Sequence, residues 1–289
     1  MTDSLQRFLF ENTPIRGHLA HLDATWRAVL ERHEYPEPLR SILGELMAAG
    51  ALLSATLKFD GSLIMQMQGD GVVKLVVVEV TSEGTMRATA NWDGEIPVEP
   101  LKTLLGSGRF VITLVPRDGQ QSYQGVVALE GESVAAVLEH YMSSSEQLET
   151  HMWLASDDRQ AAGMLLQKLP SGESEDADAW NRVSHLGSTV SAEELLRLPA
   201  REILRRLFHE EDVRVFEATP LSFRCSCSRE RVTGMLRLLG PDEVRSIVTE
   251  QGKIEVTCEF CRRRYVLDSV DAEQVFATDI QTQAGSTRH

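Results

Sequence analysis

The residues best suited to chemistry lie near the C-terminus, where all four cysteines of this 289-residue chain are found. They form two close pairs, Cys225-Ser-Cys227 and Cys258-Glu-Phe-Cys261, separated by residues 228–257. Four thiolates in this arrangement are the ligand set of a tetrahedral Zn²⁺ site, and a closed shell of four sulfurs leaves no position open for water or substrate. The spacing therefore predicts a metal site with a structural or redox role and argues against a hydrolytic one.

Cationic side chains flank both cysteine pairs. Arg224, Arg229 and Arg231 lie around the first pair, and the run Arg262-Arg263-Arg264 follows the second. Cationic neighbours lower the pKa of a thiol and stabilise the thiolate, which is the form that binds metal and reacts with oxidants. The same arginines also fit a solvated face or a nucleic-acid patch beside a zinc ribbon, so both interpretations stay open here.

The pairing of the cysteines permits a switch as well as a permanent ribbon. Each pair is close enough in sequence for its two sulfurs to bond to each other once the metal leaves. In small zinc modules the binding free energy of the metal is also folding free energy. Oxidation of the ligands would therefore unfold the module and whatever depends on it, whereas a permanent ribbon would only shape the C-terminus.

Composition restricts the possible partners. The net charge of −14 and a pI near 5.1 argue against a general affinity for nucleic acid or anionic membranes, since phosphate binding needs an excess of Lys and Arg. The N-terminus lacks the pattern of a signal peptide, and no apolar run is long enough to span a bilayer. We therefore expect a cytoplasmic protein, and in that reducing compartment clustered cysteines favour metal ligation or redox sensing.

Residues 1–170 predict a large domain of strands and helices. Apolar residues at helical spacing predict a central helix over 36–58, and Ser133 is placed to cap a helix over 134–142. The simplest interpretation of the strands is an antiparallel meander that the later strands extend. The strand segments are two within 5–22, one around 63–67, and then 72–80, 85–92, 110–115, 123–129, 146–154 and 162–169.

Several methionines fall in or near these elements. Thioethers suit promiscuous apolar recognition, but filling a hydrophobic core is the commoner use, and we favour it here. The residues concerned are Met65, Met67, Met86, Met142, Met152 and Met164.

The acidic segment 171–178 marks a change in composition and predicts a domain boundary. Short amphipathic helices are expected beyond it, over 180–186, 191–198 and 200–209, with a capping box formed by Ser191 and Glu194. Helices of this length are marginal unless they pack against a neighbour. Residues 171–220 are therefore predicted to be a metastable helical linker.

Residues 221–289 contain the cysteines. The pattern predicts helices over 229–239 and 242–251 and strands over 254–257 and 265–267. A module this small buries too little apolar surface to be secure without a metal. The expected fold class is thus α+β: an N-terminal domain with a mainly antiparallel sheet and packed helices, a helical linker, and a small zinc-binding α+β module.

The residues around the cysteines closely resemble a known family. Segments 223–230, Phe-Arg-Cys-Ser-Cys-Ser-Arg-Glu, and 254–261, Ile-Glu-Val-Thr-Cys-Glu-Phe-Cys, resemble the redox-regulated bacterial holdase chaperones, the thirty-three-kilodalton heat-shock family. Looser similarities extend over nearly the whole chain, including Arg7-Phe-Leu-Phe and Arg16-Gly-His-Leu near the N-terminus.

The resemblance implies a cytoplasmic, ATP-independent chaperone that is inactive when reduced. In that state Cys225, Cys227, Cys258 and Cys261 would hold one Zn²⁺ per chain. On oxidation the resemblance implies the disulfides Cys225–Cys227 and Cys258–Cys261, release of zinc, unfolding of the linker, formation of a homodimer and binding of unfolding client proteins. No nucleic-acid or membrane partner is expected.

Two rival functions fit parts of the pattern. A zinc-ribbon regulator would bind nucleic acid through Arg262–Arg264, but the acidic balance and the large β-rich domain argue against it. A thiol oxidoreductase would also use paired cysteines, but it would need one exposed thiol of low pKa on a thioredoxin-like scaffold. The chain carries no nucleophile motif such as G-x-S-x-G, so we expect a chaperone and not an enzyme.

Overall fold

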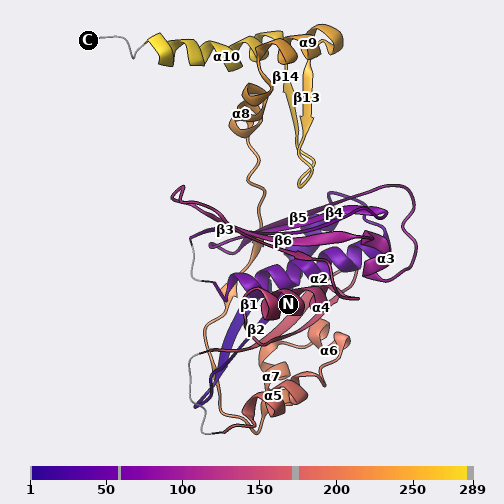
Figure 1. Cartoon of the computed structure of the whole chain (residues 1–289), viewed down its shortest axis with the longest axis vertical. Helices are drawn as coiled ribbons and strands as arrows, with labels where there is room; N and C mark the ends of the chain where they lie inside the picture. Colours follow the sequence, from indigo (N-terminus) through magenta and orange to yellow (C-terminus); the bar gives the residue numbers. More distant parts are fainter. Residues whose placement is uncertain (1, 58–59, 171–175, 285–289) are drawn as a thin grey trace. The chain divides into compact units, whose positions relative to one another are not determined.

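A computed structural model describes residues 2–57, 60–170 and 176–284, with side chains described as far as Phe276 (Figure 1). The chain divides into two compact units, one that ends at Arg224 and one that begins at Cys225. The mixture of antiparallel sheets and helices confirms the predicted α+β class. Within the described ranges, no helix combines the length and the apolarity that crossing a bilayer requires.

The first sheet of the N-terminal unit has the order β10-β1-β2-β9-β8, and β11 also pairs with β1. All of its pairings are antiparallel, and the hairpin predicted within residues 5–22 forms its centre. The strands are β1 (Ser4–Phe10), β2 (Ile15–Leu22), β8 (Thr150–Ser156), β9 (Ala161–Lys168), β10 (Val213–Val215) and β11 (Thr219–Pro220).

The second sheet has the order β12-β5-β4-β3-β6-β7. Its first strands form the predicted meander, but β6 returns to the free side of β3 rather than adding beyond β5. Strands β6 and β7 extend this sheet as predicted, whereas the hairpins β1–β2 and β8–β9 form the separate first sheet, which the long-range pairing of β2 with β9 joins. The strands are β3 (Gly61–Gly69), β4 (Val73–Thr81), β5 (Thr85–Trp92), β6 (Gly108–Pro116), β7 (Tyr123–Ala128) and β12 (Ser222–Phe223).

The predicted central helix, α2 (Glu37–Ser54), lies between the two sheets (Figure 1). It is apolar nearly all round, as a fully enclosed helix must be. A Cβ at Gly44 would lie 2.6 Å from Cβ of Ser156 in β8, and a Cβ at Gly50 would lie 3.0 Å from the Val80 side chain in β4. These two glycines therefore let both sheets approach the helix closely. The predicted last residue of the helix, Lys58, lies outside the described residues.

Three further helices of the N-terminal unit pack against the two sheets. They are α1 (Ala24–Leu30), α3 (Leu101–Leu105) and α4 (Val134–Ser144). The Ser133 side chain accepts a hydrogen bond from the Ala136 N–H, which confirms the predicted cap of α4. The six methionines singled out in the sequence are all buried, so the core-filling interpretation is confirmed.

Three short helices cover the face of the first sheet that α2 leaves open: α5 (Ala179–Gly187), α6 (Ala192–Arg197) and α7 (Ala200–Phe208). Their positions and the capping box of Ser191 and Glu194 agree with the sequence prediction. The acidic boundary predicted over 171–178 lies outside the described residues as far as 175. Whether 171–220 is a separate, metastable segment stays a prediction.

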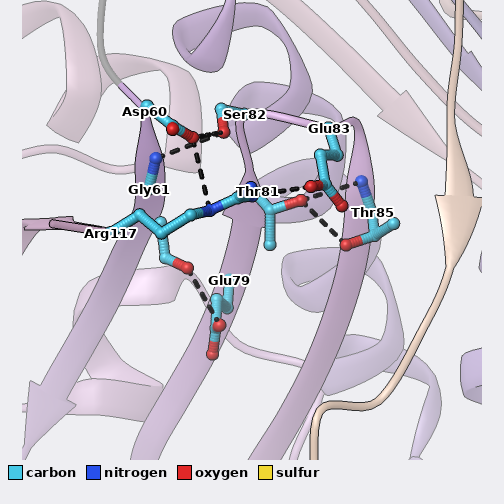
Figure 2. A network of polar contacts seen from close by, with 9 residues as sticks. Asp60, Gly61, Glu79, Thr81, Ser82, Glu83, Thr85 and Arg117 are labelled. Atoms are coloured by element: carbon cyan, nitrogen blue, oxygen red, sulfur yellow. Dashed lines mark hydrogen bonds and ion pairs between the residues drawn. The ribbon is translucent and has the colours of Figure 1, made fainter.

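A polar network fixes the turn between β4 and β5 (Figure 2). Ser82 Oγ donates to Asp60 Oδ1 at 2.9 Å, and the Arg117 guanidinium lies 2.7 Å from Glu83. The same turn receives β12, because the Ser222 N–H donates to the Gly84 carbonyl at 3.0 Å. The network therefore anchors the last strand before the cysteines.

The C-terminal unit is small and has its own core. It consists of α8 (Arg229–Leu239), α9 (Pro241–Gln251), the hairpin of β13 (Ile254–Thr257) and β14 (Arg264–Leu267), and α10 (Ser269–Ala284). The helices α8 and α9 and the strands β13 and β14 match the predicted ones, whereas α10 was not predicted. The buried apolar residues are Val232, Leu236, Val244, Ile254, Tyr265, Leu267, Ala272 and Val275. An apolar core of so few residues supplies little hydrophobic stabilisation.

Candidate metal centre

Each cysteine pair is held by a short, defined piece of backbone. Cys225 and Cys227 precede α8, whose first turn is capped by Ser228 through a bond from the Arg231 N–H to the Ser228 hydroxyl. The second pair lies in the turn between β13 and β14. There the Arg262 N–H donates to the Cys258 carbonyl at 2.8 Å, and Arg262 adopts a left-handed φ of 60°. Few residues take that conformation without cost, so the turn is specifically shaped.

These elements bring all four sulfurs together, although the two pairs are distant in sequence. The Sγ atoms of Cys225, Cys227, Cys258 and Cys261 all lie within 4.8 Å of one another. Sγ of Cys225 is 3.7 Å from that of Cys258, and Sγ of Cys227 is 3.3 Å from that of Cys261. In a tetrahedron with Zn–S bonds of about 2.3 Å, neighbouring sulfurs are about 3.8 Å apart. The cluster therefore has the size of a four-thiolate zinc site.

The four side chains are reduced thiols of intermediate burial. Burial raises the pKa of Cys258 and raises that of Cys261 to about 12, and neighbouring sulfurs add to both shifts. Burial also opposes ionisation of Cys227, but hydrogen bonds from the Tyr265 hydroxyl and the other thiols lower the pKa of Cys227 to about 7. Ionisation of Cys227 is thus favoured, whereas ionisation of Cys258 and Cys261 is opposed. A bound divalent cation would stabilise the thiolates and offset that opposition.

Tyr265 is a neighbour of the sulfurs that sequence reasoning did not assign to the site. Its hydroxyl donates to Cys227 Sγ at 3.1 Å, while its ring is buried in the small core of the unit. The alternation of β14 was the available signal, because it places Tyr265 on the inward side with Leu267. Groups that contact metal ligands in this way orient them and tune their basicity.

The arginines around the cysteines are partly engaged by carboxylates. Arg229 lies 2.7 Å from Asp271, and Arg264 lies 2.5 Å from Glu255. Arg231 instead donates to the Ser226 hydroxyl at 2.7 Å. These contacts reduce the positive charge that the site presents to a polyanion, and Arg229, which also donates to the Val266 carbonyl at 3.2 Å, links α8 to both α10 and the hairpin.

Comparison with known proteins defines the class of the molecule. A family model described as Hsp33 protein matches residues 3–268. The chain therefore belongs to the Hsp33 family, and its role is that of a chaperone, which binds unfolded client proteins.

Individual relatives agree with this assignment. A protein named 33 kDa chaperonin from Chromobacterium violaceum is 55% identical, over 99% of this chain and 98% of its own. One of the same name from Methylobacillus flagellatus is 52% identical, over 100% of this chain and 99% of its own. The crystal structure of the 33 kDa chaperonin from Thermotoga maritima superposes with a TM-score of 0.83 at 20% identity, covering 96% of this chain and 99% of that chain, which supports the fold.

Proposed function

We propose that this chaperone is a redox-regulated, ATP-independent holdase. In the reduced state one Zn²⁺ per chain is held by Cys225, Cys227, Cys258 and Cys261, and the protein does not bind clients. The observation that carries the proposal is the convergence of the four sulfurs within 4.8 Å, at the size a four-thiolate zinc site requires. When bound, the metal supplies folding free energy to the C-terminal unit.

Oxidation removes the ligands from the metal. Each thiolate pair loses two electrons to an oxidant such as hydrogen peroxide, which is reduced to water, and the products are the disulfides Cys225–Cys227 and Cys258–Cys261. A disulfide sulfur is no longer an anionic ligand, so Zn²⁺ leaves. The C-terminal unit then keeps only its small apolar core, and we expect it to unfold.

Unfolding of the C-terminal unit then leads to unfolding of the linker, residues 171–220. Helices α5, α6 and α7 are six to nine residues long and depend on packing against the first sheet. Beyond α7 the chain pairs with the two sheets through the three-residue strand β10 and the two-residue strands β11 and β12, and Leu221 packs into the core around α2. Loss of order from Cys225 onward therefore removes support from weakly anchored backbone.

Release of these helices exposes an apolar surface, the helix-covered face of the first sheet. Phe208 in α7 packs against Phe8 and Phe10 in β1, with ring centroids 6.2 and 5.0 Å apart. The sheet residues of this face are Phe8, Phe10, Ile15, Leu19, Met164 and Leu166, all of them buried. An uncovered patch of this kind attracts exposed apolar segments of unfolding proteins, and it favours a homodimer for the same reason.

The same reasoning favours a cytoplasmic holdase over a zinc-ribbon regulator of nucleic acid. The net charge is −14, and Arg229 and Arg264 already have carboxylate partners. It also favours a holdase over an enzyme, since the sulfurs form one closed shell and leave no reactive position.

Zinc stoichiometry tests the proposal. Native mass spectrometry of reduced protein should detect one Zn²⁺ per chain, and the conservative variant Cys258→Ser should bind it far more weakly. Ser107→Ala, a change of an exposed serine in the N-terminal unit, is the control and should retain the metal. Reduced protein that carries no zinc after purification in zinc-containing buffer contradicts the proposal.

A further inference from the structure

Strand β7 forms an open edge of the second sheet. It pairs with β6 on one side and ends the strand order on the other. The Leu129 N–H donates to the Gly108 carbonyl at 3.0 Å, which continues the register that pairs Val127 with Phe110. Since amides along a strand alternate in direction, the backbone groups of Gln124 and Val126 point away from β6.

These outward groups have no backbone partner among the residues that the structure describes. The edge ends at Ala128, whose carbonyl accepts from the Glu130 N–H at 2.9 Å. Gln124 and Val126 thus present two N–H donors and two C=O acceptors at the spacing of a β-ladder. Only another extended backbone matches this pattern.

Edge strands normally carry protection against such pairing, through charge, proline, short length or cover. The edge β8 and the short outer strands follow that rule. In β8 the Met152 N–H is capped by Glu139 at 2.6 Å, and α4 and α6 pack on the strand. Strands β10, β11 and β12 are two or three residues long.

Strand β7 lacks these protections. Its six residues, Tyr-Gln-Gly-Val-Val-Ala, include neither a charged residue nor a proline. Tyr123 and Val126 are 51% and 53% exposed. A mainly apolar pocket beside Tyr123, lined by Leu63, Ile112 and Leu114 but also by Arg16 and Glu146, lies on the β6 side of the strand and leaves the outward edge open.

We propose that the outward edge of β7 binds an extended, uncharged segment of an unfolded client by adding it as a further strand of the second sheet. The inference rests on the proposed holdase function and adds a second contact to the helix-covered face. Main-chain hydrogen bonds recognise any such segment regardless of its sequence, which suits a chaperone of many clients. The edge of β7 is open even while the linker helices cover the first sheet. It therefore adds to the affinity for clients but does not switch client binding on or off.

Amide exchange tests this geometry residue by residue. The probe is a short peptide of alternating valine and threonine, added to peroxide-treated protein. Nuclear magnetic resonance should show slower hydrogen exchange at the Gln124 and Val126 amides and no change at Gly125 and Val127, which already face β6. A peptide N-methylated at every residue carries methyl groups along both of its edges, so neither edge can pair with β7, and it should give no protection.

Variants test the contribution of the edge to client holding. Val126→Lys adds the charge that natural edges use, and Val126→Pro removes an outward donor without disturbing the bonds to β6. Either should weaken peptide binding about tenfold, which for the proline variant is the effect expected from losing about one hydrogen bond. Val98→Lys makes the same change at an exposed valine outside the strands and should bind normally.

The outcomes separate this inference from the proposed function. If oxidised protein holds clients but Val126→Lys holds them equally well and the two amides stay unprotected, the edge proposal is overturned and the holdase stands. If oxidised protein holds no client at all, the holdase fails whatever the edge does. If the Val126 amide exchanges more slowly as the protein concentration rises, with no peptide present, a second copy of this chain occupies the edge. That result also overturns the proposal.

Discussion

The hydroxyl oxygen of Tyr265 lies 3.1 Å from Sγ of Cys227, to which it donates a hydrogen bond. This contact joins the apolar core of the C-terminal unit to its sulfur cluster, because the ring of Tyr265 is buried in that core. A hydrogen bond to a thiolate stabilises the charged form that a metal requires. Tyr265 therefore positions Cys227 and favours its ligand state.

Removal of this hydroxyl should weaken the metal site while leaving the fold in place. Tyr265→Phe keeps the ring, and we expect zinc affinity to fall about 10- to 100-fold, the range seen when partners of metal ligands are lost. Competition with a chromogenic chelator measures the affinity. Tyr123→Phe removes an exposed hydroxyl from the N-terminal unit and is the matched control. Equal zinc affinities for the two variants would show that the contact has no role.

The disulfides formed on oxidation should lie within the pairs, although the structure places Cys227 closest to Cys261 of the other pair. Once zinc leaves and the unit unfolds, the chain between the partners sets their effective concentration, and closing a short loop costs less entropy than closing a long one. Peptide mapping after peroxide treatment at mildly raised temperature should yield Cys225–Cys227 and Cys258–Cys261. Predominant crossed linkages would contradict this order of events.

The linker helices should be released by a change that never touches the cysteines. Phe208 is 2% exposed and packs on Phe8 and Phe10, so Phe208→Ala should cost about 3–5 kcal/mol of packing. We expect faster proteolysis within 171–220 and partial suppression of client aggregation by the reduced, zinc-loaded protein.

Phe110→Ala provides the control for this variant, because Phe110 is equally buried but belongs to the core around α2. It should lower global stability without uncovering the helix-covered face selectively. If Phe208→Ala is cleaved no faster than the control in the linker and stays inactive when reduced, these helices are not the cover.

The sequence predicted the local elements well, but it did not predict which strands pair when they are far apart in the chain. The boundaries of β5 and β13 and the caps at Ser133 and Ser191 follow from short patterns, and the structure confirms them. The two-sheet arrangement does not follow, because the residues of β2 indicate a buried strand and not that β9 lies beside it. Pairings over such separations depend on the whole chain.

The candidate site shows the same division. Cysteine spacing alone indicated one four-sulfur cluster, since few other arrangements use two close pairs. The contact of Tyr265 with Cys227 required the register of β13 and β14, where Val256 faces Tyr265. The open edge of β7 required the strand order of the second sheet, which no local pattern contains.

Glu45 should make stability depend on pH. Burial in α2 raises the pKa of this carboxyl from 4.5 to about 7, although a hydrogen bond with Ser41 opposes the shift. The folded state therefore binds a proton that the unfolded state releases, and Glu45 should lower stability progressively as pH rises from about 4.5 to 7. Glu45→Gln should remove this penalty, so its gain over the natural chain should grow to roughly 1–3 kcal/mol at pH 8.

Urea denaturation of both proteins at pH 5 and pH 8 measures that difference. Comparison at each pH cancels the general repulsion of a chain with net charge −14. A gain that is the same at both pH values would mean that Glu45 titrates normally in the folded state.

The most direct measurement of the central claim follows aggregation and zinc together. A thermally unfolding client is incubated with reduced or peroxide-treated protein, and a chromogenic chelator reports released metal in the same cuvette. The account predicts that reduced protein keeps its zinc and leaves the client to aggregate, whereas peroxide-treated protein releases one zinc per chain and suppresses aggregation. Equal suppression by both forms, or activation with the zinc still bound, would contradict it.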